Sequence, residues 1–247
     1  MIRAASSDEL EQLVLRYGND PRKGIQTALR TAQRQVNRAQ SENQRLTGLY
    51  RLLESTPDSI VVGIDEVGRG ALAGPLLVAA VILPAHPYIY GLDDSKRLTP
   101  DQRRKLASRI FEVATAVGLG RVEAADIDQF GMAMALRQAI GLALQTLDVE
   151  PDVVLLDGRP LNIHPQEVAI VGGDATEASI AAASVIAKVT RDEWMIKVDK
   201  VYPGYGLAAN KGYGTPTHVA ALKKLGLSEI HRKSFCSSIL HEQESLF

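Results

Sequence analysis

Five short apolar runs alternate with longer helical segments along most of this 247-residue chain. Each run is four to eight residues long and rich in Val, Ile, Leu or Ala, which is typical of strands buried in a sheet. Strands that alternate with helices predict an α/β domain, in which helices cover the faces of a sheet. The predicted strands are residues 59–64, 76–83, 118–124, 153–156 and 168–171, and the predicted helices are residues 100–117, 126–147, 177–201 and 216–225.

The first 58 residues differ from the remainder because they are rich in Gln, Arg, Leu and Asn and contain no strand-like run. Their apolar spacing predicts a short helix followed by one long or broken helix. We therefore expect a helical N-terminal extension over residues 1–58 and an α/β domain, with a helical C-terminal segment, over residues 59–247. The extension could be a docked or loosely attached helical unit, or an arm that contacts a partner or nucleic acid.

Composition excludes several classes of protein. The 28 basic and 29 acidic residues give a formal net charge of -1, and no apolar run approaches the roughly 18 residues of a membrane span. The single cysteine, Cys236, excludes an internal disulfide and suits a reducing cytoplasm, where we expect the chain to reside. The sequence contains no GxSxG elbow, P-loop or CxxC, so serine-hydrolase, Walker-type and dithiol chemistries lack support.

The segment GIDEVGRGALAGP carries the strongest chemical signal in the sequence. Asp65 and Glu66 lie at the end of a predicted strand, where burial of two carboxylates is costly unless a cation lies against them. Carboxylate oxygens are the ligands that Mg²⁺ and Mn²⁺ prefer, so a divalent metal is the expected cation. Gly68 and Gly70 allow a tight turn, and Arg69 between them could face an anion.

Two further acids follow predicted strands. Asp157 ends residues 153–156, and Asp174 follows the Gly-Gly pair after residues 168–171. Taken singly, Asp157 could simply be a polar strand end, and Asp174 could cap the helix that follows it. Three strand-end acid sites in one α/β domain together suggest two-metal phosphodiester chemistry.

Several polar residues could contact a nucleic-acid substrate. Ser184 and Lys188 share a helix face at i,i+4 spacing and could hold a phosphate. Lys96 lies in a polar loop before the helix at residue 100; that loop could contact backbone phosphate or merely cap the helix. Tyr213 lies between glycines in NKGYGTPTH, so its ring could stack on a base or sugar, or could pack the loop onto the core.

A dinucleotide-binding site is an alternative interpretation of the glycine-rich turn. The spacing of Gly68, Gly70 and Ala73 after a strand fits the relaxed dinucleotide fingerprint. That fingerprint should open a helix, whereas Gly74-Pro75 and a strand-like run follow here. A non-enzymatic protein that binds nucleic acid is a third possibility, and it would not need carboxylates clustered around a metal.

Five motifs occur in an order that resembles bacterial ribonuclease HII, the type 2 ribonuclease H. They are GIDEVGRGALAGP, DDSKRLT, LLDG, the GGD before ASIAAASVIAKVTRD, and NKGYGTPTH, and the resemblance covers about residues 59–235. It implies a ribonuclease H-like fold, a mixed sheet flanked by helices. It also implies cleavage of the RNA strand of RNA–DNA hybrids and incision at single ribonucleotides embedded in DNA, as in ribonucleotide excision repair and DNA replication.

The resemblance also assigns roles to individual residues. The family's catalytic carboxylates, which hold two Mg²⁺ or Mn²⁺ ions, match Asp65, Glu66, Asp157 and Asp174. Its 2′-hydroxyl-reading segment matches Gly68, Arg69 and Gly70, its junction-reading tyrosine matches Tyr213, and a basic residue near the phosphates matches Lys96. We expect a monomer, and the resemblance leaves open whether a sliding clamp recruits the chain.

The near-zero net charge is the sum of two opposing parts. Residues 59–187 hold ten basic and sixteen acidic residues, whereas residues 188–233 hold nine basic and four acidic residues. The basic segment is therefore predicted to face phosphates, and binding should weaken as salt concentration rises.

Overall fold

The computed structural model describes residues 7–244. By internal packing the chain forms two compact units, one ending at Leu49 and the other beginning at Tyr50. The second unit opens with α3 (Arg51–Ser55). The predicted boundary at residue 58 follows this helix and stays a prediction. Among the residues described, none of the helices has the length and apolar character that crossing a bilayer requires.

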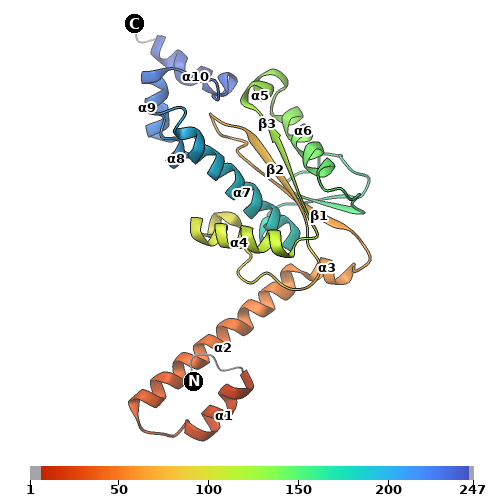
Figure 1. The fold of residues 1–247 in the computed structure, drawn as a ribbon, viewed down its shortest axis with the longest axis vertical. Helices are drawn as coiled ribbons and strands as arrows, with labels where there is room; N and C mark the ends of the chain where they lie inside the picture. Colours follow the sequence, from red (N-terminus) through yellow and green to blue (C-terminus); the bar gives the residue numbers. More distant parts are fainter. Residues whose placement is uncertain (1–6, 245–247) are drawn as a thin grey trace. The chain divides into compact units, whose positions relative to one another are not determined.

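The first unit is a pair of helices, α1 (Ser7–Tyr17) and α2 (Lys23–Leu49) (Figure 1). They bury a small apolar cluster of Leu10, Ala32 and Val36. The prediction of a short helix followed by a long one is therefore confirmed for this part of the chain.

The second unit is built on a five-stranded mixed sheet in the order β3-β2-β1-β4-β5. Its strands are β1 (Val61–Val67), β2 (Leu76–Ile82), β3 (Ala116–Val122), β4 (Val153–Asp157) and β5 (Glu167–Ile170). Strands β1, β2 and β3 form an antiparallel meander, while β1, β4 and β5 run parallel. All five predicted strands exist, and the mixed sheet that the resemblance implied is confirmed.

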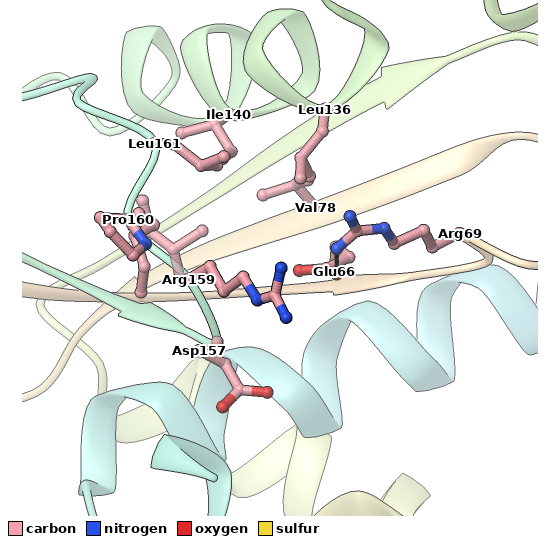
Figure 2. A pocket seen from close by; sticks show the side chains of 12 residues that line it. Glu66, Arg69, Val78, Leu136, Ile140, Asp157, Arg159, Pro160 and Leu161 are labelled. Atoms are coloured by element: carbon pink, nitrogen blue, oxygen red, sulfur yellow. Dashed lines mark hydrogen bonds and ion pairs between the residues drawn. The ribbon is translucent and has the colours of Figure 1, made fainter. Parts of the chain in front are cut away.

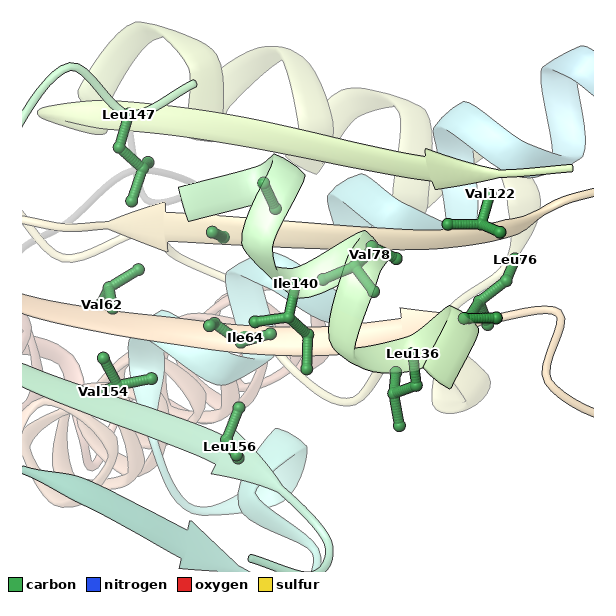
Figure 3. Close-up of a cluster of buried hydrophobic side chains, with 14 of the residues drawn as sticks. Val62, Ile64, Leu76, Val78, Val122, Leu136, Ile140, Leu147, Val154 and Leu156 are labelled. Atoms are coloured by element: carbon green, nitrogen blue, oxygen red, sulfur yellow. The ribbon is translucent and has the colours of Figure 1, made fainter. Parts of the chain in front are cut away.

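One face of the sheet is covered by α6 (Met132–Gln145). Alternate strand residues such as Val62 and Ile64 meet helix residues such as Leu136 and Ile140 in a continuous apolar layer (Figure 3). Full burial of one such side chain contributes about 1.5–3 kcal/mol, so this layer fixes which strand residues face α6. Residues of opposite parity must face the other side of the sheet.

That other face is covered by α7 (Ala178–Asp199). The helix approaches β1 so closely that a Cβ on Gly63 would lie 2.2 Å from the carbonyl carbon of Ser179. Small side chains on the helix permit this approach, and they include Ala181, Ala182, Ala183 and Ala187, all fully buried. The close packing predicted from the alanine-rich segment is confirmed, and it brings α7 against the strand that carries Asp65.

Two predicted helices have different bounds in the structure. A single helix over residues 126–147 is wrong, because the chain forms α5 (Ala124–Phe130) and α6, separated by Gly131 at φ 78° and ψ 160°. The helix predicted to reach residue 117 is α4 (Pro100–Val113), which ends early because β3 begins at Ala116. In both cases apolar spacing continues across a break in backbone conformation.

The C-terminal part of the second unit is helical. It contains α8 (Leu207–Asn210), α9 (Pro216–Leu225) and α10 (Lys233–Glu244). These helices and the end of α7 enclose a second apolar cluster that includes Met195, Leu222 and Cys236. The helical C-terminal part is confirmed, and it lies against the glycine-rich turn through a bridge between Ala73 and His231.

Candidate active site

Three acids converge at the ends of β1, β4 and β5. The parallel register pairs Ile64 with Leu156, so the next residues, Asp65 and Asp157, lie side by side on the α7 face. Asp174 follows β5 in the short 3-10 helix η3 (Gly173–Ala175). One carboxylate oxygen from each acid lies within 4.8 Å of the others. We call these residues, Asp65, Asp157 and Asp174, the acid trio.

The second reading of Asp174, as a helix cap, is wrong. The N-cap position of α7 belongs to Glu177, and Asp174 turns toward the other acids instead. The backbone N–H of Gly173 donates to Oδ1 of Asp157 at 2.9 Å, which ties η3 to the end of β4. Asp174 is only 4% exposed, so its carboxylate lies inside the site and not on the surface.

The electrostatics of the acid trio favour a bound cation. Burial raises the pKa of Asp65 to about 7, and the carboxylates of Glu66 and Asp157 act in the same direction against a hydrogen bond from Ser184. The ammonium of Lys96 lies 2.9 Å from Oδ2 of Asp174. Three clustered carboxylates supply hard oxygen ligands and more negative charge than one ammonium can balance, which fits Mg²⁺ or Mn²⁺.

Glu66 lies outside the acid trio because consecutive strand residues point to opposite faces of a sheet. Its carboxylate shares the α6 face with Ile64 and Val78 in a second pocket of about 390 Å³. Arg69 Nη1 lies 3.4 Å from Oε1 of Glu66. Burial raises the pKa of Glu66, while Arg69 opposes that shift. The structure therefore brings three of the four predicted metal ligands together and places the fourth across the strand end.

All seven predicted substrate-binding residues line one hollow of about 280 Å³ beside Asp65 and Glu66. They come from four separate stretches of the chain, and they are Gly68, Arg69, Gly70, Lys96, Ser184, Lys188 and Tyr213. We call this hollow the catalytic pocket. Its walls join the turn after β1, the loop before α4, one face of α7 and the loop before α9.

Several contacts orient the side chains of the catalytic pocket. The hydroxyls of Ser184 and Ser95 lie 2.9 Å apart, and both residues are buried. The ammonium of Lys188 lies 2.8 Å from Asp192 and 6.0 Å from the centre of the Tyr213 ring. The helix and both flanking loops are thereby joined at the pocket.

Two fully buried arginines hold the glycine-rich turn. Arg191 donates from Nε to the carbonyl of Pro75 at 2.9 Å and from Nη2 to that of Ala73 at 3.0 Å. Arg232 donates from Nη1 to the carbonyl of Arg69 at 3.0 Å and from Nη2 to that of Gly74 at 2.9 Å. The turn is therefore fixed by side chains distant in sequence.

Gly68 shows why the turn needs glycine. Its φ is +90°, a conformation that side chains disfavour, and a Cβ there would lie 2.3 Å from Nε of Arg191. Sequence reasoning did not identify Arg191 or Arg232, because a basic residue is expected on the surface unless a partner is known.

Arg159 is a further residue that the sequence analysis missed. It is exposed, lines the pocket beside Glu66 and Asp157, and extends along that pocket toward Glu66 (Figure 2). Its position two residues after Asp157 could have identified it, because residues just beyond the end of a strand lie at the same edge of the sheet as the site. Its guanidinium adds positive charge next to the acids.

The dinucleotide alternative is wrong for this turn. The glycines lead into β2, which pairs antiparallel with β1, and not into a helix whose N-terminus could bind a pyrophosphate.

Sequence comparisons agree with this geometry. The family model described as Ribonuclease HII matches residues 62–238, and that described as Ribonuclease HII N-terminal domain matches residues 1–52. The chain is 45% identical over 219 residues to Ribonuclease HII of Geobacillus thermodenitrificans, covering 87% of this chain and 85% of that one. It is 40% identical over 232 residues to Ribonuclease HII of Enterococcus faecalis, covering 93% and 91%.

Solved structures share the fold. Ribonuclease H2 from Pyrococcus horikoshii OT3 superposes with a TM-score of 0.64 at 26% identity, covering 74% of this chain and 98% of that one. The RNase HII of a PCNA:RNase HII complex from Archaeoglobus fulgidus gives a TM-score of 0.61 at 23% identity, covering 72% and 94%. Bst-RNase HIII in complex with Mn²⁺ gives 0.57 at 19% identity, covering 78% and 72%.

Proposed function

The chain belongs to the ribonuclease HII family, and on that premise we propose how its site selects and cuts a substrate. As a member of that family it is a metal-dependent ribonuclease H that acts on RNA–DNA hybrids. We propose further that it incises duplex DNA 5′ of a single embedded ribonucleotide, leaving a 5′-phosphate and a 3′-hydroxyl.

The observation that carries this proposal is the composition of the catalytic pocket. Groups suited to a ribose hydroxyl, a phosphate and a sugar face surround Asp65 in one hollow. A hydrolase for a small apolar substrate would need an apolar pocket. The lysine, arginine and serine side chains that line this pocket suit the backbone of a nucleic acid, which is read through its phosphates and 2′-hydroxyls.

We propose that Asp65, Glu66, Asp157 and Asp174 together hold two divalent ions. Bound Mg²⁺ or Mn²⁺ would supply an activated water and would stabilise the charge on the leaving 3′-oxygen. The four carboxylates would act on the scissile phosphate indirectly, by holding the divalent ions next to it. Glu66 would serve from the opposite face of β1, where Arg69 already neutralises part of its charge.

The turn after β1 would recognise ribose. The backbone amides of Gly68 to Gly70 would hydrogen-bond the 2′-hydroxyl, the group that distinguishes RNA from DNA. Arg69, whose side chain is 63% exposed, would contact a phosphate together with Lys96. Because Arg191 and Arg232 hold the carbonyls of this turn, its amides are fixed before substrate arrives.

The opposite wall of the pocket would hold the following deoxynucleotide. Tyr213 would stack on its sugar, and Ser184 and Lys188 would contact its phosphate. Arg159 would contact a phosphate from the α6 side of the strand ends. These roles extend the predictions from the resemblance. The placing of Tyr213, Ser184 and Lys188 in the catalytic pocket, and of Arg159 in the pocket on the α6 side, supports them.

The proposal extends to the setting of the enzyme. We propose that it acts as a cytoplasmic monomer in ribonucleotide excision repair and DNA replication. A structure of a PCNA:RNase HII complex is known for the Archaeoglobus fulgidus protein, so a sliding clamp is the partner we propose to test.

The deciding experiment uses a DNA duplex with one ribonucleotide. Incubation with Mg²⁺ should cut the strand 5′ of the ribonucleotide, and the products should carry 5′-phosphate and 3′-hydroxyl ends. The same reaction in EDTA should leave the duplex intact. A protein that binds the duplex but does not cut it in Mg²⁺ or Mn²⁺ would overturn the proposed incision.

A further inference from the structure

Two buried histidines form a pair behind the catalytic pocket. His218 lies on α9, His231 lies just before α10, and their residues are 0% and 2% exposed. Their Nε2 atoms are 3.1 Å apart, and the Tyr205 ring packs 4.7 Å from His231. Neither histidine has the sequence spacing of a metal ligand, and neither is among the predicted site residues.

The contacts of the pair assign every ring proton. The backbone N–H of Ser228 can only donate, and it donates to Nδ1 of His231 at 3.0 Å. Nδ1 of His231 is therefore bare, and its proton resides on Nε2. That Nε2–H donates to Nε2 of His218, whose own proton must then reside on Nδ1.

The proton on Nδ1 of His218 points at the loop before α9. Nδ1 of His218 lies 2.9 Å from the backbone carbonyl oxygen of Tyr213 and donates to it. The hydroxyl of Ser228, 2.7 Å from Nδ1 of His231, closes the other end of the chain. Both rings are neutral in this arrangement, because a proton added to either would set two N–H groups against one another. Burial lowers the pKa of both rings, that of His231 to about 4, which agrees with neutral imidazoles.

The pair completes a series of contacts along the loop before α9. The carbonyl of Lys211 accepts from Arg191 at 2.8 Å, and that of Gly212 accepts from the N–H of Leu72 at 2.8 Å. The carbonyl of Tyr213 is the next in sequence and accepts from His218. Three consecutive carbonyls are thus held from outside the loop. The third, which also accepts from the N–H of Thr215 at 2.8 Å, belongs to the tyrosine whose ring lines the catalytic pocket.

We propose that the His218–His231 pair, neutral and locked in opposite tautomers, is a positioning device that fixes Tyr213 for reading the junction between RNA and DNA. The proposal rests on the proposed function, because it needs Tyr213 to contact substrate. His218 and His231 do not touch substrate; they act through the Tyr213 carbonyl. A misplaced ring would weaken recognition of an isolated ribonucleotide, which is followed by a deoxynucleotide. It would affect cleavage within a long hybrid less, because there each ribonucleotide is followed by another ribonucleotide.

Two variants of His218 separate positioning from packing. In His218→Asn the side-chain amide nitrogen takes the place of Nδ1 and can still donate to Tyr213, whereas His218→Leu removes that donor. We expect His218→Leu to lower kcat/KM on the single-ribonucleotide duplex about tenfold relative to its own kcat/KM on a long hybrid. His218→Asn should recover most of that ratio. The matched control is His86→Leu at a histidine whose side chain is 68% exposed, and it should leave the ratio unchanged.

The ratio of the two activities is the decisive readout, since loss of folded protein lowers both alike. A folded His218→Leu variant with the wild-type ratio would overturn the proposal, as would His218→Asn with the ratio lost. A wild-type chain that does not incise the single-ribonucleotide duplex would instead overturn the proposed function.

Nitrogen-15 NMR of the full chain tests the tautomers without substrate. At pH 7, long-range proton–nitrogen spectra should show His218 protonated on Nδ1 and His231 protonated on Nε2. Of the five histidine signals, those of His218, His86 and His231 are assigned by the His218→Asn, His86→Leu and His231→Gln variants. The same tautomer in both rings, or an imidazolium in either, would overturn the pair as described.

Discussion

The second unit holds two groups of ionisable side chains that burial treats in opposite ways. The acids gather at one edge of the sheet, where Asp65 and Glu66 line the catalytic pocket, and burial raises the pKa of both. The bases lie behind the loops that frame the pocket, and burial lowers their pKa. The members of this second group are Arg191, His218, His231 and Arg232.

The difference lies in how each group is satisfied. The buried bases already have partners, since backbone carbonyls accept from both guanidiniums and from His218. Among the described residues, the ion pairs of these acids are those of Lys96 with Asp174 and of Arg69 with Glu66, and Arg159 lies beside Glu66 and Asp157 without an ion pair to either. The buried bases are hydrogen-bonded and hold the loops in place, whereas the acids carry excess negative charge that a bound cation would neutralise. The acids should therefore control the chemical step and the bases the position of the loops.

The largest expected effect is the loss of activity in Asp65→Asn. An amide cannot supply the charge that a divalent ion needs, so kcat should fall about 10³-fold or more at saturating Mg²⁺. Rates on a long RNA–DNA hybrid and the circular dichroism spectrum measure activity and folding separately. The control is Asp101→Asn at an acid whose side chain is 81% exposed, which should keep full activity. Full activity in a folded Asp65→Asn variant would contradict the metal assignment.

Replacement of Arg232 by Met should mainly cost stability. The change leaves the carbonyls of Arg69 and Gly74 without a buried donor, and we expect a loss of about 3 kcal/mol in the free energy of unfolding. Urea unfolding measures it. Arg109→Met, at a surface arginine paired with Glu112, should change stability by less than about 1 kcal/mol. Equal losses in the two variants would mean that Arg232 does not hold the turn.

The two groups also differ in how far the sequence predicts them. The acid trio follows from local pattern, because Asp65 and Asp157 directly follow apolar runs, Asp174 comes shortly after another, and the parallel register aligns Asp65 with Asp157. The buried arginines follow from contacts more than 110 positions away, such as Arg191 with Pro75, which local pattern does not contain. Both arginines belong to the basic segment, residues 188–233, that was predicted to face phosphates. In the structure both are 0% exposed and donate to backbone carbonyls instead.

Local sequence pattern also fails to predict where a helix is interrupted and toward which face of the sheet a strand-end side chain points. The two halves of the helix predicted over residues 126–147 keep their apolar spacing, so only the positive φ of Gly131 separates them. Asp65 and Glu66 look equivalent in sequence, but the pleat assigns them to opposite faces. The sequence therefore predicts which residues gather at the site better than it predicts how each one faces it.

Stability without metal should depend on pH through Asp65. Burial raises its pKa from 3.8 to about 7, so the folded chain binds more protons than the unfolded chain between these values. Stability should therefore fall as pH rises from about 4 to 7, because the fold must ionise a buried carboxyl. In EDTA at pH 8, Asp65→Asn should be more stable than the wild type, with little difference in the free energy of unfolding at pH 4.

Thermal unfolding with EDTA and with Mg²⁺ measures this effect. Mg²⁺ should stabilise the wild type more than Asp65→Asn, since it relieves the same charge. A variant that is less stable than the wild type at pH 8 in EDTA would show that Asp65 is already compensated in the free chain.

The smallest expected effect is that of Tyr213→Ala. Loss of the ring should reduce kcat/KM on the single-ribonucleotide duplex about tenfold, the value of one stacking contact, and should change hybrid cleavage less. Tyr213→Phe keeps the ring and should keep most of the activity. The carbonyl held by His218 is a backbone atom, so Tyr213→Ala leaves it in place. If buried bases only position the ring, then His218→Leu combined with Tyr213→Ala should be no worse on this duplex than Tyr213→Ala alone. An additive loss would mean that the bases act on the substrate by a second route.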